Sequence, residues 1–205
     1  MIIPVADAEV SSGSGAAGAA ERSEWSRLDH HTKRERLLET ATEVFAGSGL
    51  DAPMSDVAEA AGAGVASVYR MFASKRELLA AIVTRRFEHI AQAAEDACAR
   101  DGDRWTALTD MLTDLVRTQR ADYMMGEARA AVSDHADVVA AVARADAAQE
   151  RLLAAARAEG RLRADATTLD LRLLFAATRA ARRVEPEQWP RMLQLLIDAL
   201  DSRRA

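Results

Sequence analysis

The sequence predicts an all-α protein with an N-terminal helix-turn-helix unit of three helices and a larger C-terminal helical domain. Alanine supplies 46 of the 205 residues, whereas proline (4) and glycine (10) are scarce. Alanine has the lowest free-energy cost of any residue in a helix, so this composition favours helices. Aromatic residues make up only 4% of the chain, too few for a sheet built on large cross-strand pairs.

Composition also excludes several classes of protein. A single cysteine, Cys98, excludes a disulfide framework and a cysteine-based zinc site. The longest uncharged run, residues 10–20, is far shorter than the roughly twenty residues that span a bilayer, so no membrane association is expected. The first residues do not resemble a signal peptide, so a cytoplasmic protein is expected. We find no pattern typical of a catalytic site, a metal site or a cofactor site.

The helices are predicted in order from capping residues and apolar spacing. Residues 1–28, rich in Ser, Gly and Ala, are expected to be a flexible tail. Thr32, three residues before Glu35, forms a capping-box pattern, and apolar residues at helical spacing follow until 47–49. Pro53 suits the start of a second, short helix, which ends at a turn where Gly62 and Gly64 can supply positive φ angles.

A third short helix is predicted from Val65 to about Met71, and a long one from a second capping box at Ser74–Glu77 to about Ala99. Two short helices joined by a tight turn form a helix-turn-helix pattern. Apolar spacing predicts five further helices over about 105–116, 123–132, 136–158, 168–182 and 190–200.

The pattern from Pro53 to Leu78, with Tyr69, Phe72 and Lys75 at its core, resembles the DNA-binding domain of the tetracycline-repressor (TetR) family. The resemblance is strong over about 32–85, although Ala63 and Ala66 replace the Val and Gly that are usual there. It implies a DNA-binding domain over 29–86 and an effector-binding and dimerisation domain over 87–205. It further implies a homodimeric repressor that a small molecule releases from operator DNA.

Charge is compatible with this resemblance. The net charge of −5 argues against nucleic-acid binding, but residues 29–86 carry eight basic and eight acidic groups, a balance of 0. By resemblance, Tyr69 and Lys75 grip phosphates, and Ala66, Ser67 and Arg70 lie nearest the base edges, where arginine can pair with guanine. Lys33 and Arg76 are expected to be solvated charges. The expected DNA-binding residues are Ser55, Val65, Ala66, Ser67, Tyr69, Arg70 and Lys75.

The last two predicted helices are expected to form a dimer interface. The final helix is apolar nearly all round, as expected of a helix buried on several sides. A chain of this size cannot readily bury both helices by itself, so a two-fold dimer with a four-helix bundle is expected. The expected interface residues are Leu173, Ala177, Met192, Leu196, Ile197 and Leu200.

The helices between the two ends are expected to hold a pocket for a small apolar effector. Methionine pairs provide adaptable packing for such a ligand. The expected lining residues are Phe87, Trp105, Met111, Tyr123, Met124, Met125 and Phe175, with Gln119, His135 and Gln149 as polar anchors.

Two other functions fit parts of the sequence. One is a DNA-binding regulator that responds to no small molecule. The other is an all-α enzyme or scaffold with an incidental helix-turn-helix, which the absence of any nucleophile–base arrangement disfavours.

Overall fold

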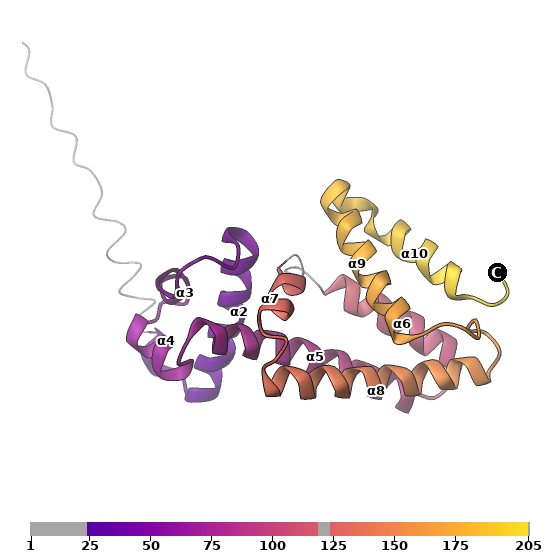
Figure 1. Ribbon diagram of the computed structural model, residues 1–205, viewed down its shortest axis with the longest axis horizontal. Coiled ribbons are helices and arrows are strands. Elements are labelled where there is room, and N and C mark those ends of the chain that lie inside the picture. Colours follow the sequence, from indigo (N-terminus) through magenta and orange to yellow (C-terminus); the bar gives the residue numbers. More distant parts are fainter. Residues whose placement is uncertain (1–23, 119–123, 205) are drawn as a thin grey trace, which may run out of the picture. The chain divides into compact units, whose positions relative to one another are not determined.

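The computed structural model describes residues 24–118 and 124–204, and these ranges contain helices and no strand (Figure 1). The predicted all-α fold is confirmed. None of the helices in these ranges combines the length and the hydropathy that crossing a bilayer requires. The helices are α2 (His30–Ser48), α3 (Met54–Ala60), α4 (Val65–Met71), α5 (Lys75–Ala99), α6 (Arg104–Arg117), α7 (Met125–Ala131), α8 (Ala136–Ala158), α9 (Thr168–Val184), the 3₁₀ turn η1 (Pro186–Gln188) and α10 (Trp189–Leu200).

The chain divides into two compact units, the first ending at Lys75 and the second starting at Arg76. The division therefore falls at the start of α5 rather than at residue 86, where the sequence suggested a boundary. α5 is one continuous helix of 25 residues, so a boundary at residue 86 would cut through the middle of a helix.

The first unit is built on the α2, α3 and α4 helices. α3 packs against both α2 and α4. The α2 helix contributes buried apolar side chains at the spacing of a single helix face, and α3 and α4 add Val57 and Val68, both completely buried. The buried α2 side chains are Leu37, Leu38, Ala41 and Phe45.

Structure begins earlier than the predicted end of the tail at residue 28. Residues 24–27 are helical, and the Trp25 side chain is only 7% exposed. This segment is tied to α2 by the Arg36–Glu24 ion pair at 3.0 Å and by Lys33 Nζ, which donates to the Ser26 carbonyl at 3.4 Å. A tryptophan offers a large apolar surface, and its burial offsets the entropy cost of ordering the segment.

The N-cap of α2 is Asp29, not Thr32. The Asp29 carboxylate accepts hydrogen bonds from the Thr32 backbone N–H at 2.9 Å and from the Thr32 hydroxyl at 2.6 Å. These bonds stabilise the ionised form and lower the pKa of Asp29 to about 2. Asp29 therefore caps α2, in place of the capping box of Thr32 and Glu35 that the sequence suggested.

The second unit is held together by one apolar core. α8 packs against both α6 and α9, and α9 packs against α10. The core takes Leu108 and Leu112 from α6, Leu152 from α8 and Leu171 from α9, all completely buried.

Candidate nucleic-acid interface

The turn between α3 and α4 is a glycine-capped helix end. Gly62 has a φ of 67°, and its N–H donates to the Glu59 carbonyl at 3.0 Å, while the Ala63 N–H donates to the Ala58 carbonyl at 2.8 Å. This pair of bonds is the Schellman arrangement, which needs a left-handed residue at the position of Gly62. Gly64 has a φ of −76°, so the expectation of a positive φ there is wrong.

One side of the α4 helix is buried in the first unit, and the other side is exposed. Val68 and, just after the helix, Phe72 are buried, as predicted. Val65 is 43% exposed and Tyr69 is 48% exposed, and Ala66 is also exposed. Residues at i and i+4 share a helix face, so Val65 and Tyr69 lie together on the outer face of α4.

Two of the predicted base-reading residues contact each other. Arg70 Nη2 donates to Ser67 Oγ at 2.7 Å within α4. The guanidinium carries five N–H donors, so this bond leaves donors free for a nucleic acid. Ser55, on the exposed side of α3, donates instead to the Asp56 carboxylate at 3.2 Å.

Two cations of the first unit lie over buried aromatic rings. Lys75 Nζ is 5.5 Å from the centre of the Phe45 ring, and the Arg34 guanidinium is 4.8 Å from the centre of the Phe72 ring. Such contacts hold a positive charge at a fixed place without neutralising it.

A hollow of about 310 Å³ lies beside α4. It brings the predicted residues Ser67 and Arg70 together with Lys33, which the sequence suggested was merely a solvated charge. Sequence reasoning missed the contribution of Trp25, although a lone tryptophan at the end of a Ser/Gly/Ala-rich segment was an available signal. The lining residues are Trp25, His30, Lys33, Ser67, Arg70 and Met71.

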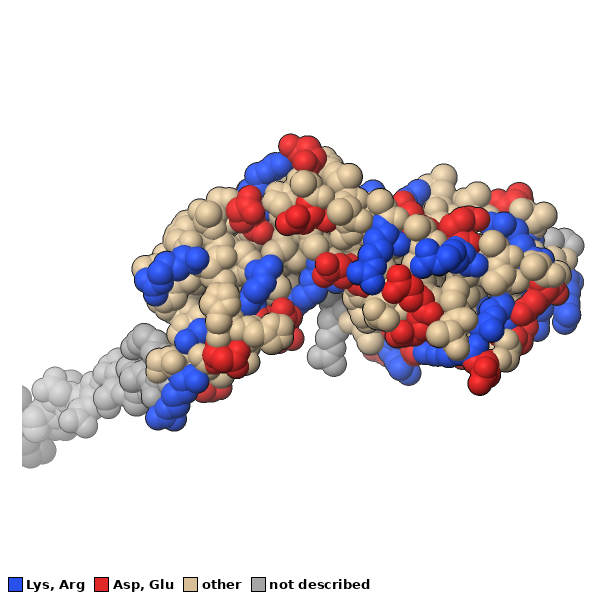
Figure 2. All heavy atoms as spheres, turned by 90° about the horizontal axis from the view of Figure 1, so that it is seen from below, with Lys and Arg blue, Asp and Glu red and all other residues tan. Residues whose placement is uncertain are grey.

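Positive and negative side chains are interspersed on the face of the protein seen in Figure 2. No single-sign field dominates that face, in agreement with the balance of charges in residues 29–86. If the first unit binds a nucleic acid, the contact must depend on the positions of a few cations rather than on overall charge.

In the second unit, most of the predicted effector-lining residues belong to the apolar core. Trp105, Met111 and Phe175 are buried in it, and Phe87 packs against it. Met124 is also buried, whereas Met125 is half-buried. Tyr123 and Gln119 lie outside the described residues. Of the other suggested polar anchors, Gln149 is buried and His135 lies in the loop before α8.

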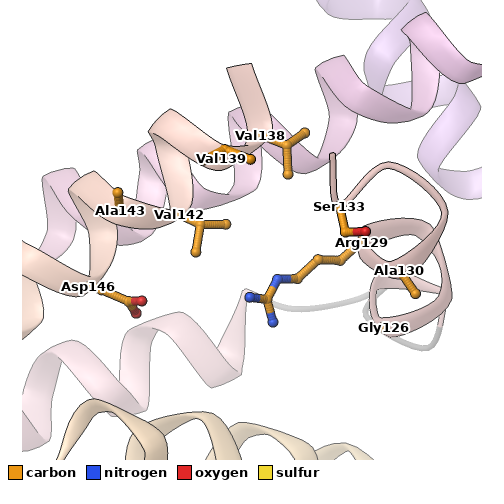
Figure 3. A pocket seen from close by; sticks show the side chains of 9 residues that line it. All are labelled: Gly126, Arg129, Ala130, Ser133, Val138, Val139, Val142, Ala143 and Asp146. Carbon is orange, nitrogen blue, oxygen red and sulfur yellow. The ribbon is translucent and has the colours of Figure 1, made fainter. Parts of the chain in front are cut away.

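A larger hollow, of about 680 Å³, lies between α7 and α8 and is lined by none of the residues predicted for the effector (Figure 3). Sequence reasoning missed it because its apolar wall is short and Arg129, a cation among its lining residues, looks like a surface charge. The lining residues are Gly126, Arg129, Ala130, Ser133, Val138, Val139, Val142, Ala143 and Asp146.

The loop between α7 and α8 is bound to the first turn of α5. Arg76 donates to the Ala131 carbonyl at 2.9 Å and to the Asp134 carboxylate at 2.5 Å, so this exposed side chain is ion-paired rather than simply solvated. This bond lowers the pKa of Asp134 below its ordinary value. His135 Nε2 lies 3.3 Å from the Glu77 carboxylate. We call these contacts of Arg76 and Glu77 the α5 latch.

The predicted dimer residues fall into two groups. Ile197 and Leu200 are buried in the core of the protomer itself, so they do not present an outer surface. Leu173 is 58% exposed, while Ala177, Met192 and Leu196 are half-buried. Further exposed residues lie on the Leu173 face of α9, at helical spacing, and on α10. These are Leu169, Ala176, Ala180 and Val184 on α9, and Leu195 on α10.

Comparison with known proteins identifies the first unit most clearly. A family model described as "Bacterial regulatory proteins, tetR family" matches residues 37–82, which include α3, the turn and α4. The chain is 36% identical over 83 residues to the uncharacterized HTH-type transcriptional regulator YvdT of Bacillus subtilis. It is 31% identical over 110 residues to the HTH-type transcriptional repressor KstR of Mycolicibacterium smegmatis.

These two curated relatives are matched only in part. The matched stretches are 40% of this chain and 42% of YvdT, and 53% of this chain and 54% of KstR. The chain thus spans about half the length of the curated relatives it matches. A crystal structure of a TetR transcription regulatory protein from Mycobacterium vanbaalenii is similar over more of the chain. That similarity covers 84% of this chain and 97% of the other at 32% identity, with a TM-score of 0.51.

Proposed function

This chain belongs to the tetR family of bacterial regulatory proteins, and from that membership we propose that it is a homodimeric repressor of transcription. It binds operator DNA through α3 and α4, and a small-molecule effector bound by the second unit releases it. The family and the curated relatives are transcriptional regulators rather than enzymes. The role as a repressor follows the printed name of KstR.

The observation that carries the proposal is the outer face of α4. The exposed residues there are Val65, Ala66, Tyr69 and Arg70. Val65 and Tyr69 are large side chains, which would more often be buried on a helix that contacts no other molecule. A recognition helix is expected to expose residues of this kind, because the small Ala66 lets the backbone approach a major groove. Arginine can then pair with a guanine.

A second copy of the chain is the proposed occupant of the exposed apolar face on α9 and α10. Leu169, Leu173 and Val184 are exposed on α9, and Leu195 is exposed on α10. Exposed apolar residues that gather on one helix face mark interaction surfaces, and a two-fold dimer buries the same face on both copies. Binding to two successive major grooves would require the two recognition helices of a dimer to lie about 34–36 Å apart, the length of one helical turn of DNA.

The α5 latch supports a route for release. α5 starts at Lys75, a proposed phosphate contact, and its next residues, Arg76 and Glu77, are bound to the α7–α8 loop. A ligand that moves this loop therefore moves the first turn of α5, which changes the spacing of the recognition helices in a dimer. By linkage, a ligand that weakens operator binding must itself bind more weakly to the DNA-bound protein.

Selection from a random library of double-stranded DNA, followed by fluorescence anisotropy on the selected site and a scrambled one, tests DNA recognition. We expect Tyr69→Phe to weaken binding by a similar factor on both DNAs. Lys75→Ala should reduce the slope of log affinity against log salt by about one. Asp110→Ala, an exposed change on α6, is the control and should bind like the wild type.

Failure to enrich any sequence, with equal affinity for selected and scrambled DNA, would overturn the proposal. Sequence-specific binding that no small molecule weakens would instead support a regulator without an effector.

A further inference from the structure

We infer that the hollow between α7 and α8 binds an amphipathic organic anion, a carboxylate or a similar acid group on an apolar body. This inference rests on the proposed function, because it names the site and chemical class of the effector. The residues that line this hollow differ from the core residues that the sequence suggested for the effector.

The size and walls of the hollow suit a small molecule. A volume of about 680 Å³ lies within the roughly 300–1,000 Å³ of small-molecule sites in proteins. Val138, Val139 and Val142 on α8 provide an apolar wall, and Gly126 and Ala130 on α7 leave room opposite. Val139 is exposed, so a ligand body that covers it would remove apolar surface from water.

The charges around the hollow favour an anion over a cation. Figure 3 shows the Arg129 guanidinium extending from α7 into the space beneath α8. No carboxylate of the described residues pairs with Arg129, which contacts the Phe87 ring at 5.4 Å from its centre. Asp146, across the hollow, already accepts two hydrogen bonds of 3.1 Å from Arg172. Arg172 therefore balances the charge of Asp146, and Arg129 leaves a positive charge at the hollow.

A ligand acid group has further polar contacts available beside Arg129. An arginine fork holds a carboxylate through two parallel hydrogen bonds, a strong and directional contact. Ser133 lines the same hollow and can donate its hydroxyl proton to an anion. Ser133 also lies in the loop that Arg76 holds, between the bonded residues Ala131 and Asp134. A ligand there reaches the α5 latch directly.

Calorimetric titration of the full chain with decanoate, 1-decanol and decylamine, all below their aggregation concentrations, tests the inference. We expect decanoate to bind and the alcohol and the amine to bind at least about tenfold more weakly, since hydrogen bonds to charged groups are the strong ones. Arg129→Met should weaken decanoate binding by a similar factor, whereas Arg129→Lys should weaken it less, because lysine keeps the charge but loses the fork. Val142→Trp, which fills the hollow, should weaken decanoate binding without any change in charge.

The matched control is Arg117→Met, an exposed arginine on α6 paired with Asp114, which should bind decanoate like the wild type. Equal binding of the alcohol and the acid, preference for the amine, or unchanged binding in both Arg129→Met and Val142→Trp would overturn the inference. Operator binding by ligand-free Arg129→Met is measured in parallel. If the wild type binds decanoate but shows no sequence-specific DNA binding, only the proposed function is refuted, because decanoate binding is measured without DNA.

Discussion

Arg70 and Ser67 form a hydrogen bond of 2.7 Å, from Nη2 to Oγ, along the exposed side of α4. The serine therefore restrains the side chain that is proposed to read a base, before any DNA is bound. Restraint of this kind lowers the entropy cost of forming the contact with DNA.

Loss of the restraint should reduce sequence discrimination without abolishing it. We expect Ser67→Ala to cost about 0.5–1.5 kcal/mol on the selected operator. Arg70→Ala should cost about 1–3 kcal/mol at the base pair that Arg70 reads. Anisotropy on operators with single base-pair changes measures both values. Equal losses on selected and scrambled DNA for Arg70→Ala would show that this residue contacts phosphates instead.

Trp25 should stabilise the first unit although it lies outside the residues that match the family model. We expect Trp25→Ala to destabilise this unit by about 3–5 kcal/mol, the range for large aromatic side chains in cores. Hydrogen exchange at amides of α2 and α4 measures the effect, with amides of α6 and α8 as the internal control. Trp25→Phe should have a smaller effect. Unchanged exchange in α2 and α4 would mean that the segment is not part of the unit.

Leu173→Glu should convert the proposed dimer into monomers that remain folded. The side chain is 58% exposed in the protomer, so the charge harms only an assembly that buries it. Light scattering at micromolar concentration measures the mass, and circular dichroism checks the fold. Val139→Glu, another exposed apolar position, is the control and should stay dimeric. A wild-type monomer at this concentration contradicts the dimer. Ile197→Glu is uninformative, because it would disrupt the protomer core.

Arg76→Gln should loosen the α7–α8 loop by removing the charged bond to Asp134. We expect faster hydrogen exchange over residues 131–135 and unchanged exchange in α6. If the latch carries the effector signal, decanoate should still bind this variant but should release operator DNA less effectively. Unchanged hydrogen exchange, or full release of operator DNA by decanoate, would show that the α5 latch does not couple effector binding to operator release.

Acid should weaken the start of α2 in a defined pH range. Because the pKa of Asp29 is lowered from 3.8 to about 2 in the folded protein, its stabilising contribution is complete above pH 4. That contribution is lost as the pH falls through about 2. Asp29→Asn keeps a side chain that can cap a helix but does not titrate. We expect this variant to lose less helix stability than the wild type between pH 4 and 2, as measured by hydrogen exchange in α2. Identical pH profiles would contradict the role of Asp29.

The all-α fold, the helix-turn-helix and the family could be predicted from the sequence, because these features follow from local patterns. Apolar residues three and four apart indicated α2 and α8, and the Tyr69, Phe72 and Lys75 spacing carried the resemblance. It also separated buried Val68 from exposed Tyr69, since adjacent residues on a helix are rotated by about 100° and can lie on different faces.

The contacts between residues that are far apart in the chain could not be predicted from local patterns and are seen only in the folded protein. Arg76 and Asp134 are 58 positions apart, and nothing near either residue in the sequence indicates the bond. Ile197 and Leu195 both belong to a helix that is apolar nearly all round, yet Ile197, a predicted interface residue, is buried in the protomer and Leu195 is exposed. Helical periodicity is set by bonds between residues four positions apart, whereas burial depends on which other helices pack against each face. For the same reason the hollow between α7 and α8, formed by side chains that two helices bring together, had no signature in the sequence.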